Sequence, residues 1–199
     1  MHSLVKRKIG LLGGTFDPIH FGHLLAAERA REEFGLEKVL FIPSGVPPHK
    51  QKVFASKAHR LAMVELAVEG NIYFESCDIE VKKKKVSYTF DTVSAVRRFN
   101  PDAEIFLITG EDAFYDLPSW HRCGELARKA VFLVAPRVRK SPAGIPAIPF
   151  LEYSFIDSPM MEISSSGIRG CISGGKTVKY LVPDRIFEYI RRYNLYDGE

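Results

Sequence analysis

Short apolar runs alternate with segments of helical periodicity along the chain, and this order restricts the fold more than any other feature. The expected strands are residues 8–12, 38–43, 72–76, 104–109, 131–135 and 154–156. The expected helices include residues 89–99, 124–129, 165–173 and 183–193, where apolar residues recur three or four positions apart. Strands that alternate with helices form parallel sheets, and consecutive apolar positions indicate strands covered on both faces. We therefore expect an α/β fold, an open parallel sheet with helices on both faces.

The length and composition fit one globular domain. The chain has 199 residues, of which 46% are hydrophobic and 26% charged, enough to bury a core and a substrate cleft. We expect a single domain over residues 1–199, with a small helical portion at about 163–199. No apolar run approaches the roughly 20 residues that span a bilayer, and residues 1–8 lack a signal-peptide core. We expect a soluble, cytoplasmic protein that contacts no membrane.

Cysteine content and charge exclude some kinds of site. Cys77, Cys123 and Cys171 are odd in number and lack metal-ligand spacing, so we expect neither a disulfide nor a zinc site. The net charge of +4 is too modest to choose between anionic small molecules and RNA as partners. The lysine run at residues 82–85 is interpreted as a solvated loop.

The segment after the first expected strand has the features of an anion-binding site. Gly13 and Gly14 let backbone amides approach a phosphate, and the helix that follows points its N–H groups at the same place. His20 and His23 flank the start of this helix, where each can donate a hydrogen bond to phosphate oxygens. The orders GxxxxGK[ST] and GxGxxG are absent, which argues against a P-loop protein and a nicotinamide dehydrogenase.

A second candidate phosphate site lies about 140 residues further along the chain, in residues 163–169. Ser165 and Ser166 stand at the start of an expected helix, where hydroxyls cap N–H groups or bind phosphate. Arg169 follows one turn later and supplies a forked cation that suits phosphate oxygens. The two segments together favour a protein that binds a polyphosphate.

Both segments resemble signatures of a known superfamily. Residues 20–23 are similar to the (H/T)xGH signature of the nucleotidyltransferases, and residues 163–169 (ISSSGIR) to their ISSTxIR segment. Four further segments resemble the PPHK, SYT, PxW and GxD motifs of bacterial nicotinate mononucleotide adenylyltransferases: residues 47–50, 87–89, 118–120 and 110–112. The resemblance implies a Rossmann-like sheet of the nucleotidyltransferase type. It also implies transfer of AMP from ATP to nicotinate mononucleotide, with release of pyrophosphate, in NAD biosynthesis.

The resemblance implies a site for each substrate. The catalytic residues would be His20, His23 and Arg169. ATP would contact Gly13, Gly14, Thr15, Phe16, His20, His23, Gly110, Asp112, Ser165, Ser166 and Arg169, with Asp112 on the ribose. Nicotinate mononucleotide would contact Asp17, Lys50, Tyr88, Thr89 and Trp120, with Lys50 near its phosphate and Trp120 stacked on the pyridine ring. Mg²⁺ would be held mainly by ATP phosphates and water, so no protein metal ligand is expected.

Several alternatives stay open. A sister enzyme that acts on nicotinamide mononucleotide or phosphopantetheine, or that cytidylates a small phosphate, would share the histidine and serine segments. An RNA-binding protein would need clustered base-stacking aromatics, which the sequence lacks, so we expect no nucleic-acid partner. The sequence does not choose between a monomer and a homodimer. Residues 135–139 (APRVR) depart from the Arg-Pro-Gly of many relatives, residues 137–149 are expected as a surface loop, and residues 194–199 carry no recognisable signal.

Overall fold

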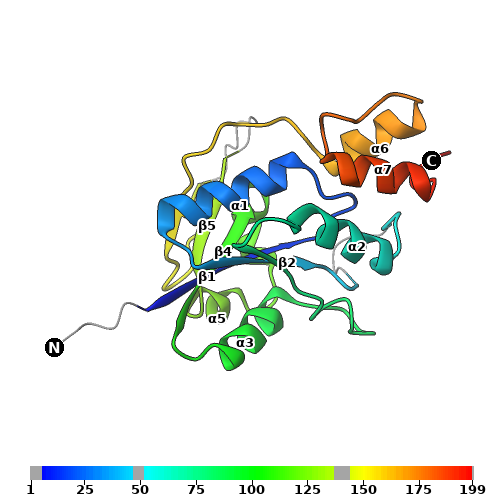
Figure 1. Ribbon diagram of the computed structural model, residues 1–199. Helices are drawn as coiled ribbons and strands as arrows, with labels where there is room; N and C mark the ends of the chain where they lie inside the picture. Colours follow the sequence, from blue (N-terminus) through cyan, green and yellow to red (C-terminus); the bar gives the residue numbers. More distant parts are fainter. Residues whose placement is uncertain (1–5, 47–51, 137–143, 199) are drawn as a thin grey trace.

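The computed structural model describes residues 6–46, 52–136 and 144–198, and Figure 1 shows how their elements are arranged. Within these residues, a six-stranded sheet has the order β3-β2-β1-β4-β5-β6, and every neighbouring pair is parallel. The strands are β1 (Arg7–Gly14), β2 (Lys38–Pro43), β3 (Phe74–Ser76), β4 (Ala103–Gly110), β5 (Val131–Ala135) and β6 (Tyr153–Phe155). The predicted open parallel α/β sheet is confirmed.

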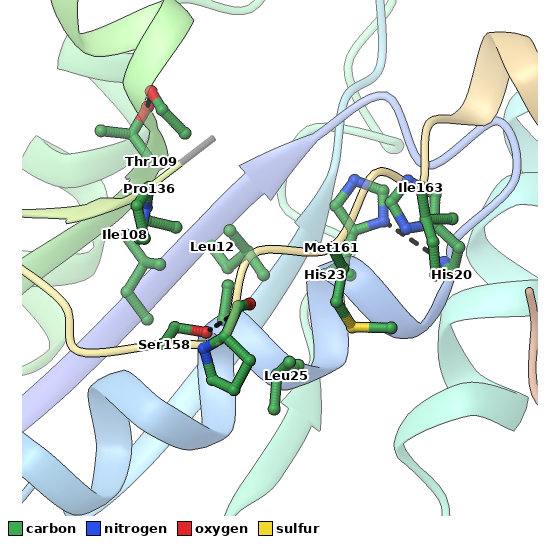
Figure 2. A pocket seen from close by; sticks show the side chains of 15 residues that line it. Leu12, His20, His23, Leu25, Ile108, Thr109, Pro136, Ser158, Met161 and Ile163 are labelled. Atoms are coloured by element: carbon green, nitrogen blue, oxygen red, sulfur yellow. Dashed lines mark hydrogen bonds between the residues drawn. The ribbon is translucent and has the colours of Figure 1, made fainter. Parts of the chain in front are cut away.

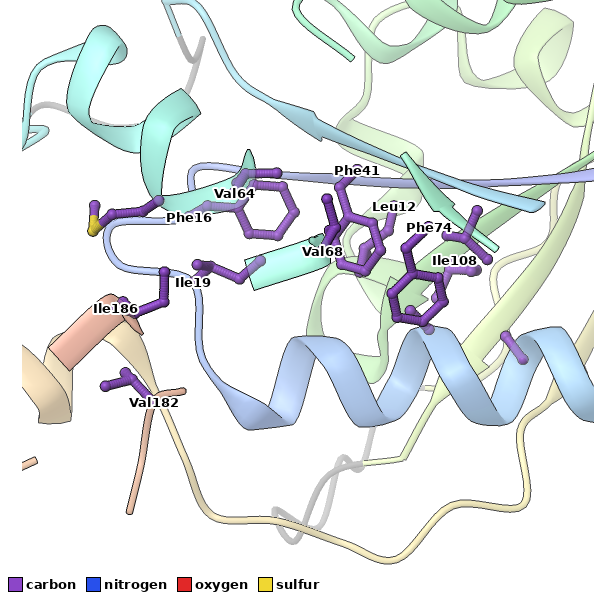
Figure 3. Close-up of a cluster of buried hydrophobic side chains, with 14 of the residues drawn as sticks. Leu12, Phe16, Ile19, Phe41, Val64, Val68, Phe74, Ile108, Val182 and Ile186 are labelled. Carbon is purple, nitrogen blue, oxygen red and sulfur yellow. The ribbon is translucent and has the colours of Figure 1, made fainter. Parts of the chain in front are cut away.

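Helices cover both faces of this sheet. One face packs against α1 (Phe21–Phe34) and α2 (Lys57–Val68). The C-terminal helices α6 (Ser165–Ser173) and α7 (Asp184–Arg192) join the same hydrophobic cluster, part of which Figure 3 shows, and α7 packs against α2. The other face packs against α3 (Thr89–Phe99), α4 (Glu111–Tyr115) and α5 (Cys123–Ala127). Along β4, Phe106 and Ile108 join the first cluster, while Ile105 and Leu107 join the second, because successive side chains of a strand alternate. This alternation explains why the run is apolar at consecutive positions.

The start of β3 corrects one predicted strand. The sequence places a strand over residues 72–76, but the structure begins it at Phe74. The chain before it forms a turn, in which the N–H groups of Tyr73 and Phe74 donate to the side chain and the backbone carbonyl of Asn71. Ile72 is 85% exposed, so its apolar side chain belongs to this turn and not to the sheet.

The end of β1 corrects a second interpretation. Gly13 and Gly14 lie inside the strand, paired in register with Ile42 and Pro43 of β2, whereas the sequence suggests a glycine loop. The connection to α1 is therefore the short segment 15–20. Because the two glycines carry no side chains, the carboxyl end of β1 stays open to a ligand.

The order of the strands locates the place where a ligand binds. The chain leaves β1 toward α1 and β2 on one side, and it leaves β4 toward β5 on the other. In open α/β sheets, ligands bind at the carboxyl ends of the strands beside such a reversal. The segments that start at Gly14 and Gly110 leave neighbouring strands at this point. Within the described part of the chain, no helix combines the length and apolar character needed to cross a membrane.

Candidate active site

A pocket of about 320 Å³ opens at the carboxyl ends of β1 and β4, on the side of α3. This volume is within the range of roughly 300–1,000 Å³ found for small-molecule sites. Its lining includes Gly13, Gly14 and Thr15 from β1 and its loop, Tyr88 and Thr89 from the start of α3, and Trp120. The structure therefore brings together three residues predicted for the mononucleotide and three predicted for ATP.

A second pocket opens on the side of α1, and Figure 2 shows the side chains that line it. His20 and His23 stand at one end of it, while Thr109 and Pro136 stand at the other. The extended segment before α6 crosses between them, with Ser158, Met161 and Ile163 in the lining. Ile108 and Thr109 border both pockets, so the two spaces meet over the end of β4.

The two histidines form a pair at the start of α1. His20 is the N-cap residue and His23 lies three positions later, in the first turn. The backbone N–H of His20 donates to Nδ1 of His23 over 3.3 Å, and the two rings stack with centroids 3.7 Å apart. Because Nδ1 of His23 accepts this bond, the neutral ring carries its proton on Nε2. His23 is thereby prepared as a hydrogen-bond donor at Nε2.

Phe16 packs against His23 of this pair. Its side chain is buried in the core, where its ring meets the edge of the His23 ring at a centroid distance of 5.0 Å. The backbone at Phe16 has a φ of 50°, a left-handed conformation that costs energy for a residue with a side chain. The prediction that Phe16 contacts ATP is therefore limited to its backbone, because the ring is committed to the core.

The serine segment reaches the β1–α1 loop from the other end of the chain. Ser164 is the N-cap of α6 and accepts a hydrogen bond from Gly167 N–H, so Ser165 and Ser166 lie in the first turn. Ser165 Oγ donates to the carbonyl of Pro18 over 2.9 Å. Arg169 donates from one terminal nitrogen to the carbonyl of Asp17 over 2.8 Å. The two signature segments, about 140 residues apart in the sequence, are therefore in contact.

Asp17 takes a different position from the one that the sequence suggests. Its side chain is 2% exposed and does not line either pocket. The carboxylate accepts hydrogen bonds from the N–H groups of Phe54 and Ala55 and from the hydroxyl of Tyr196. A buried carboxylate with these three donors holds other segments in place, so its direct contact with the mononucleotide is not supported.

The pocket beside α3 contains residues that the sequence did not single out. Ser44, Glu80 and His121 join the predicted Tyr88, Thr89 and Trp120 in its lining. The ring of His121 packs against the ring of Tyr88, with centroids 4.3 Å apart. His121 follows Trp120 directly, and this adjacency is the signal that could have identified it. No comparable local signal marks Glu80.

Glu80 places a buried carboxyl group at this pocket. Thr92 donates a hydrogen bond to its Oε1 over 2.7 Å. Burial raises the pKa of this carboxyl above its usual range, and the bond from Thr92 opposes the shift. The pocket wall therefore changes charge at a higher pH than an exposed glutamate would.

The remaining predicted residues lie in two places. Gly110 is the N-cap of α4 and lines the pocket beside α1, while Asp112 lies in the first turn of α4. Lys50 and Arg137 lie outside the residues that the structure describes. Across the described ranges, no group of three or more His, Cys, Asp or Glu residues is arranged to hold a metal ion.

Arg60 is a functional candidate that sequence reasoning missed. It is 1% exposed, and it donates to the carbonyls of Thr15, Gly45 and Ala55 over 2.7, 3.2 and 3.3 Å. Burial lowers the pKa of its guanidinium, although arginine keeps its charge in proteins. Arg60 thus links the loop after β1 to the loop after β2.

Comparison with known proteins supports the resemblance seen in the sequence. The cytidylyltransferase-like family model matches residues 11–170, which include both signature segments. A Synechococcus sp. (strain JA-3-3Ab) protein with the name "Probable nicotinate-nucleotide adenylyltransferase" is 41% identical over 197 residues, covering 96% of this chain and 95% of the relative. A Moorella thermoacetica protein of the same name is 40% identical over 205 residues, covering 98% and 94%.

Solved structures share the fold. The Plasmodium falciparum nicotinic acid mononucleotide adenylyltransferase complexed with NaAD has a TM-score of 0.80 at 20% identity, covering 97% of this chain and 98% of the other. The same Plasmodium enzyme complexed with APC has a TM-score of 0.78, also at 20% identity and with the same coverage. With sequence relatives matched over nearly their whole length, the chain belongs to the nicotinate-nucleotide adenylyltransferase family.

Proposed function

We propose that this chain transfers AMP from ATP to nicotinate mononucleotide, forming nicotinate adenine dinucleotide and pyrophosphate in NAD biosynthesis. The observation that carries the proposal is the meeting of two pockets at the end of β4. His20 and His23 border one pocket and Trp120 borders the other. ATP in the first and the mononucleotide in the second would bring the two reacting phosphates together between them. The reaction named for the full-length relatives supports the same assignment.

ATP would occupy the pocket beside α1. Gly110 and Asp112 start α4 at the end of β4, where the carboxylate of Asp112 can accept hydrogen bonds from the ribose hydroxyls. The triphosphate would extend to where the two pockets meet, over the backbone of Phe16 and over Gly13, Gly14 and Thr15, which line the pocket beside α3. The start of α1 lies beside this position, and its N–H groups and dipole favour anions. Ser165 and Arg169 contact the same loop, and together with Ser166 they would bind the outer phosphates.

Nicotinate mononucleotide would occupy the pocket beside α3. Tyr88 is the N-cap of α3 and Thr89 is its first residue, so this helix presents its positive end to the nicotinate carboxylate. Trp120 lines the same pocket and offers a flat apolar surface on which the pyridine ring can stack. Lys50 remains our candidate for the mononucleotide phosphate.

The chemistry is an in-line displacement at phosphorus. An oxygen of the mononucleotide phosphate forms a bond to the α-phosphorus of ATP, and the bond from that phosphorus to the bridging oxygen of the β-phosphate breaks. The electron pair leaves with pyrophosphate. Because the nucleophile is already an anion near neutral pH, the rate depends on positioning and charge stabilisation more than on a general base. His23, which donates from Nε2, and His20 would stabilise the charge that develops on the α-phosphoryl oxygens.

ATP would enter as its Mg²⁺ complex, with the metal held by phosphate oxygens and water. The metal would supply positive charge that stabilises departing pyrophosphate. Ser165, Ser166 and Arg169 would orient the β- and γ-phosphates from the protein side. We also infer a cytoplasmic enzyme that works as a monomer or a homodimer.

The test is pyrophosphate release by the purified protein with ATP and Mg²⁺. Nicotinate mononucleotide, nicotinamide mononucleotide and phosphopantetheine are compared at equal concentration. We expect turnover with nicotinate mononucleotide to exceed turnover with the other two acceptors. Turnover with phosphopantetheine alone would keep the histidine mechanism and reject the assignment of the pocket beside α3. No turnover with any acceptor would reject the proposed reaction.

A further inference from the structure

The segment 15–19, which connects β1 to His20, is held by side chains from distant parts of the chain. Arg60 donates to the carbonyl of Thr15, and Arg169 donates to the carbonyl of Asp17. The carboxylate of Asp17 accepts from Phe54 N–H at Oδ2 and from Ala55 N–H at Oδ1. Asp17 is therefore the point where this segment, the chain before α2 and α6 meet.

The fourth contact to Asp17 comes from the C-terminal end of the chain. Tyr196 lies beyond α7, and its hydroxyl donates to Oδ1 of Asp17 over 2.8 Å. Its side chain is 6% exposed and belongs to the hydrophobic cluster of the α1 face. Burial and the charge of Asp17 both raise the pKa of this phenol, so it stays protonated and remains a donor near neutral pH.

We propose that Tyr196 is a positioning residue for the transfer reaction, which it serves by holding Asp17 and thereby the backbone that leads to His20. This inference rests on the proposed function. Tyr196 touches neither pocket, so its effect passes through Asp17. The carbonyl of Asp17 receives Arg169, and its carboxylate receives Tyr196, so one residue connects the C-terminal segment to both signature segments.

The expected effect is on turnover more than on substrate binding. His20 follows Asp17 by three residues, and a hydrogen bond to a charged group is among the stronger ones in a protein. Without the hydroxyl, Oδ1 of Asp17 keeps its hydrogen bond from Ala55 N–H but loses the one from Tyr196, and the segment 15–19 gains freedom. Displacement of a catalytic group by about 1 Å can cost on the order of 100-fold in rate. Looser positioning without removal of any catalytic group should therefore cost about tenfold in kcat.

The experiment compares Tyr196→Phe with Tyr193→Phe. The first change removes one hydroxyl and keeps the ring. The matched control removes a hydroxyl three residues earlier, from a half-exposed tyrosine whose ring packs on His59 and Tyr189. We expect Tyr196→Phe to lower kcat about tenfold, with the KM values for ATP and the mononucleotide changed less than about threefold, and Tyr193→Phe to leave both unchanged. A lower melting temperature with unchanged kcat would show a merely structural role and overturn the proposal.

A second measurement separates this inference from the proposed reaction. Amide hydrogen exchange in a peptide that covers residues 15–20 should be faster in Tyr196→Phe than in the wild type, and unchanged in Tyr193→Phe. This measurement needs no substrate, so it tests whether the hydrogen bond from Tyr196 to Asp17 holds the segment 15–20 even if the acceptor is another phosphate. Unchanged exchange in Tyr196→Phe would overturn the positioning role of Tyr196. A wild-type protein inactive with nicotinate mononucleotide would overturn the proposed function alone.

Discussion

The backbone N–H of His20 donates a hydrogen bond to Nδ1 of His23, and the two imidazole rings stack with their centroids 3.7 Å apart. This arrangement ties the N-cap of α1 to its first turn and sets the tautomer of the neutral His23 ring. The same contact therefore begins the helix and prepares a donor for the substrate. Local structure and chemistry depend on one pair of residues.

Loss of the His23 ring should lower turnover strongly. Removal of one well-aimed donor to a transition state typically costs on the order of 100-fold to 1,000-fold in rate. We expect His23→Ala to lower kcat by about this factor, with little change in the KM for ATP. His59→Gln is the control, because His59 lies on α2 and bonds Tyr189 away from both pockets. Steady-state kinetics measures both constants. A kcat of His23→Ala equal to that of the wild type would remove this residue from the mechanism.

Gly45 should not tolerate a side chain. A Cβ atom built at this position would lie 2.2 Å from the carbonyl oxygen of Glu80, which is backbone and cannot swing away. We expect Gly45→Ala to lower the melting temperature and to raise the KM for the mononucleotide, since Ser44 and Glu80 line that pocket. Gly124→Ala is the matched control, because nothing lies within 4 Å of its Cβ position. Equal melting temperatures for the two variants would contradict this account.

Arg60 should contribute to stability through the carbonyls that it satisfies. Arg60→Met keeps much of the buried stem but leaves the carbonyls of Thr15 and Gly45 without this donor. An unsatisfied buried polar group costs about 1–3 kcal/mol, so we expect a loss of roughly 2–4 kcal/mol in the free energy of unfolding. Urea denaturation measures this change in the free energy of unfolding. Arg185→Met, which removes only an exposed ion pair with Glu69, should change the free energy by less than about 1 kcal/mol.

Glu80 should make stability depend on pH. Its folded pKa is raised by burial, so the folded state binds this proton more tightly than the unfolded state. Stability from this group is present below the unfolded pKa and is lost as the pH rises through the folded pKa. We expect Glu80→Gln, which keeps an oxygen that accepts from Thr92, to lose this dependence. As the pH rises from the unfolded pKa through the folded pKa of Glu80, melting temperatures should favour the variant increasingly, and above the folded pKa the difference should stay constant; a difference that does not change with pH would refute the assignment.

Much of the fold and part of the site follow from local signals. The strand runs at residues 38–43 and 131–135 agree with β2 and β5 because both strands are covered on both faces, which favours apolar residues at consecutive positions. His20 and His23 could be placed together from the sequence because they are three residues apart at the start of a helix. Ile72 is misplaced, since an apolar residue in an exposed turn has the same appearance in a sequence as one in a strand.

The sequence by itself determined the α/β class, the two segments proposed to bind phosphate and the family to which the chain belongs, because each of these depends on neighbours within a few residues. Only the tertiary structure decided that the carboxylate of Asp17 is buried, that Arg60 joins the loops after β1 and β2, and that Tyr196 donates a hydrogen bond to Asp17. These contacts join residues up to 179 positions apart, and no local pattern encodes them. They exist because the sheet order places β1 beside β4 and the C-terminal helices beside α2, which brings distant polar groups together where water is excluded.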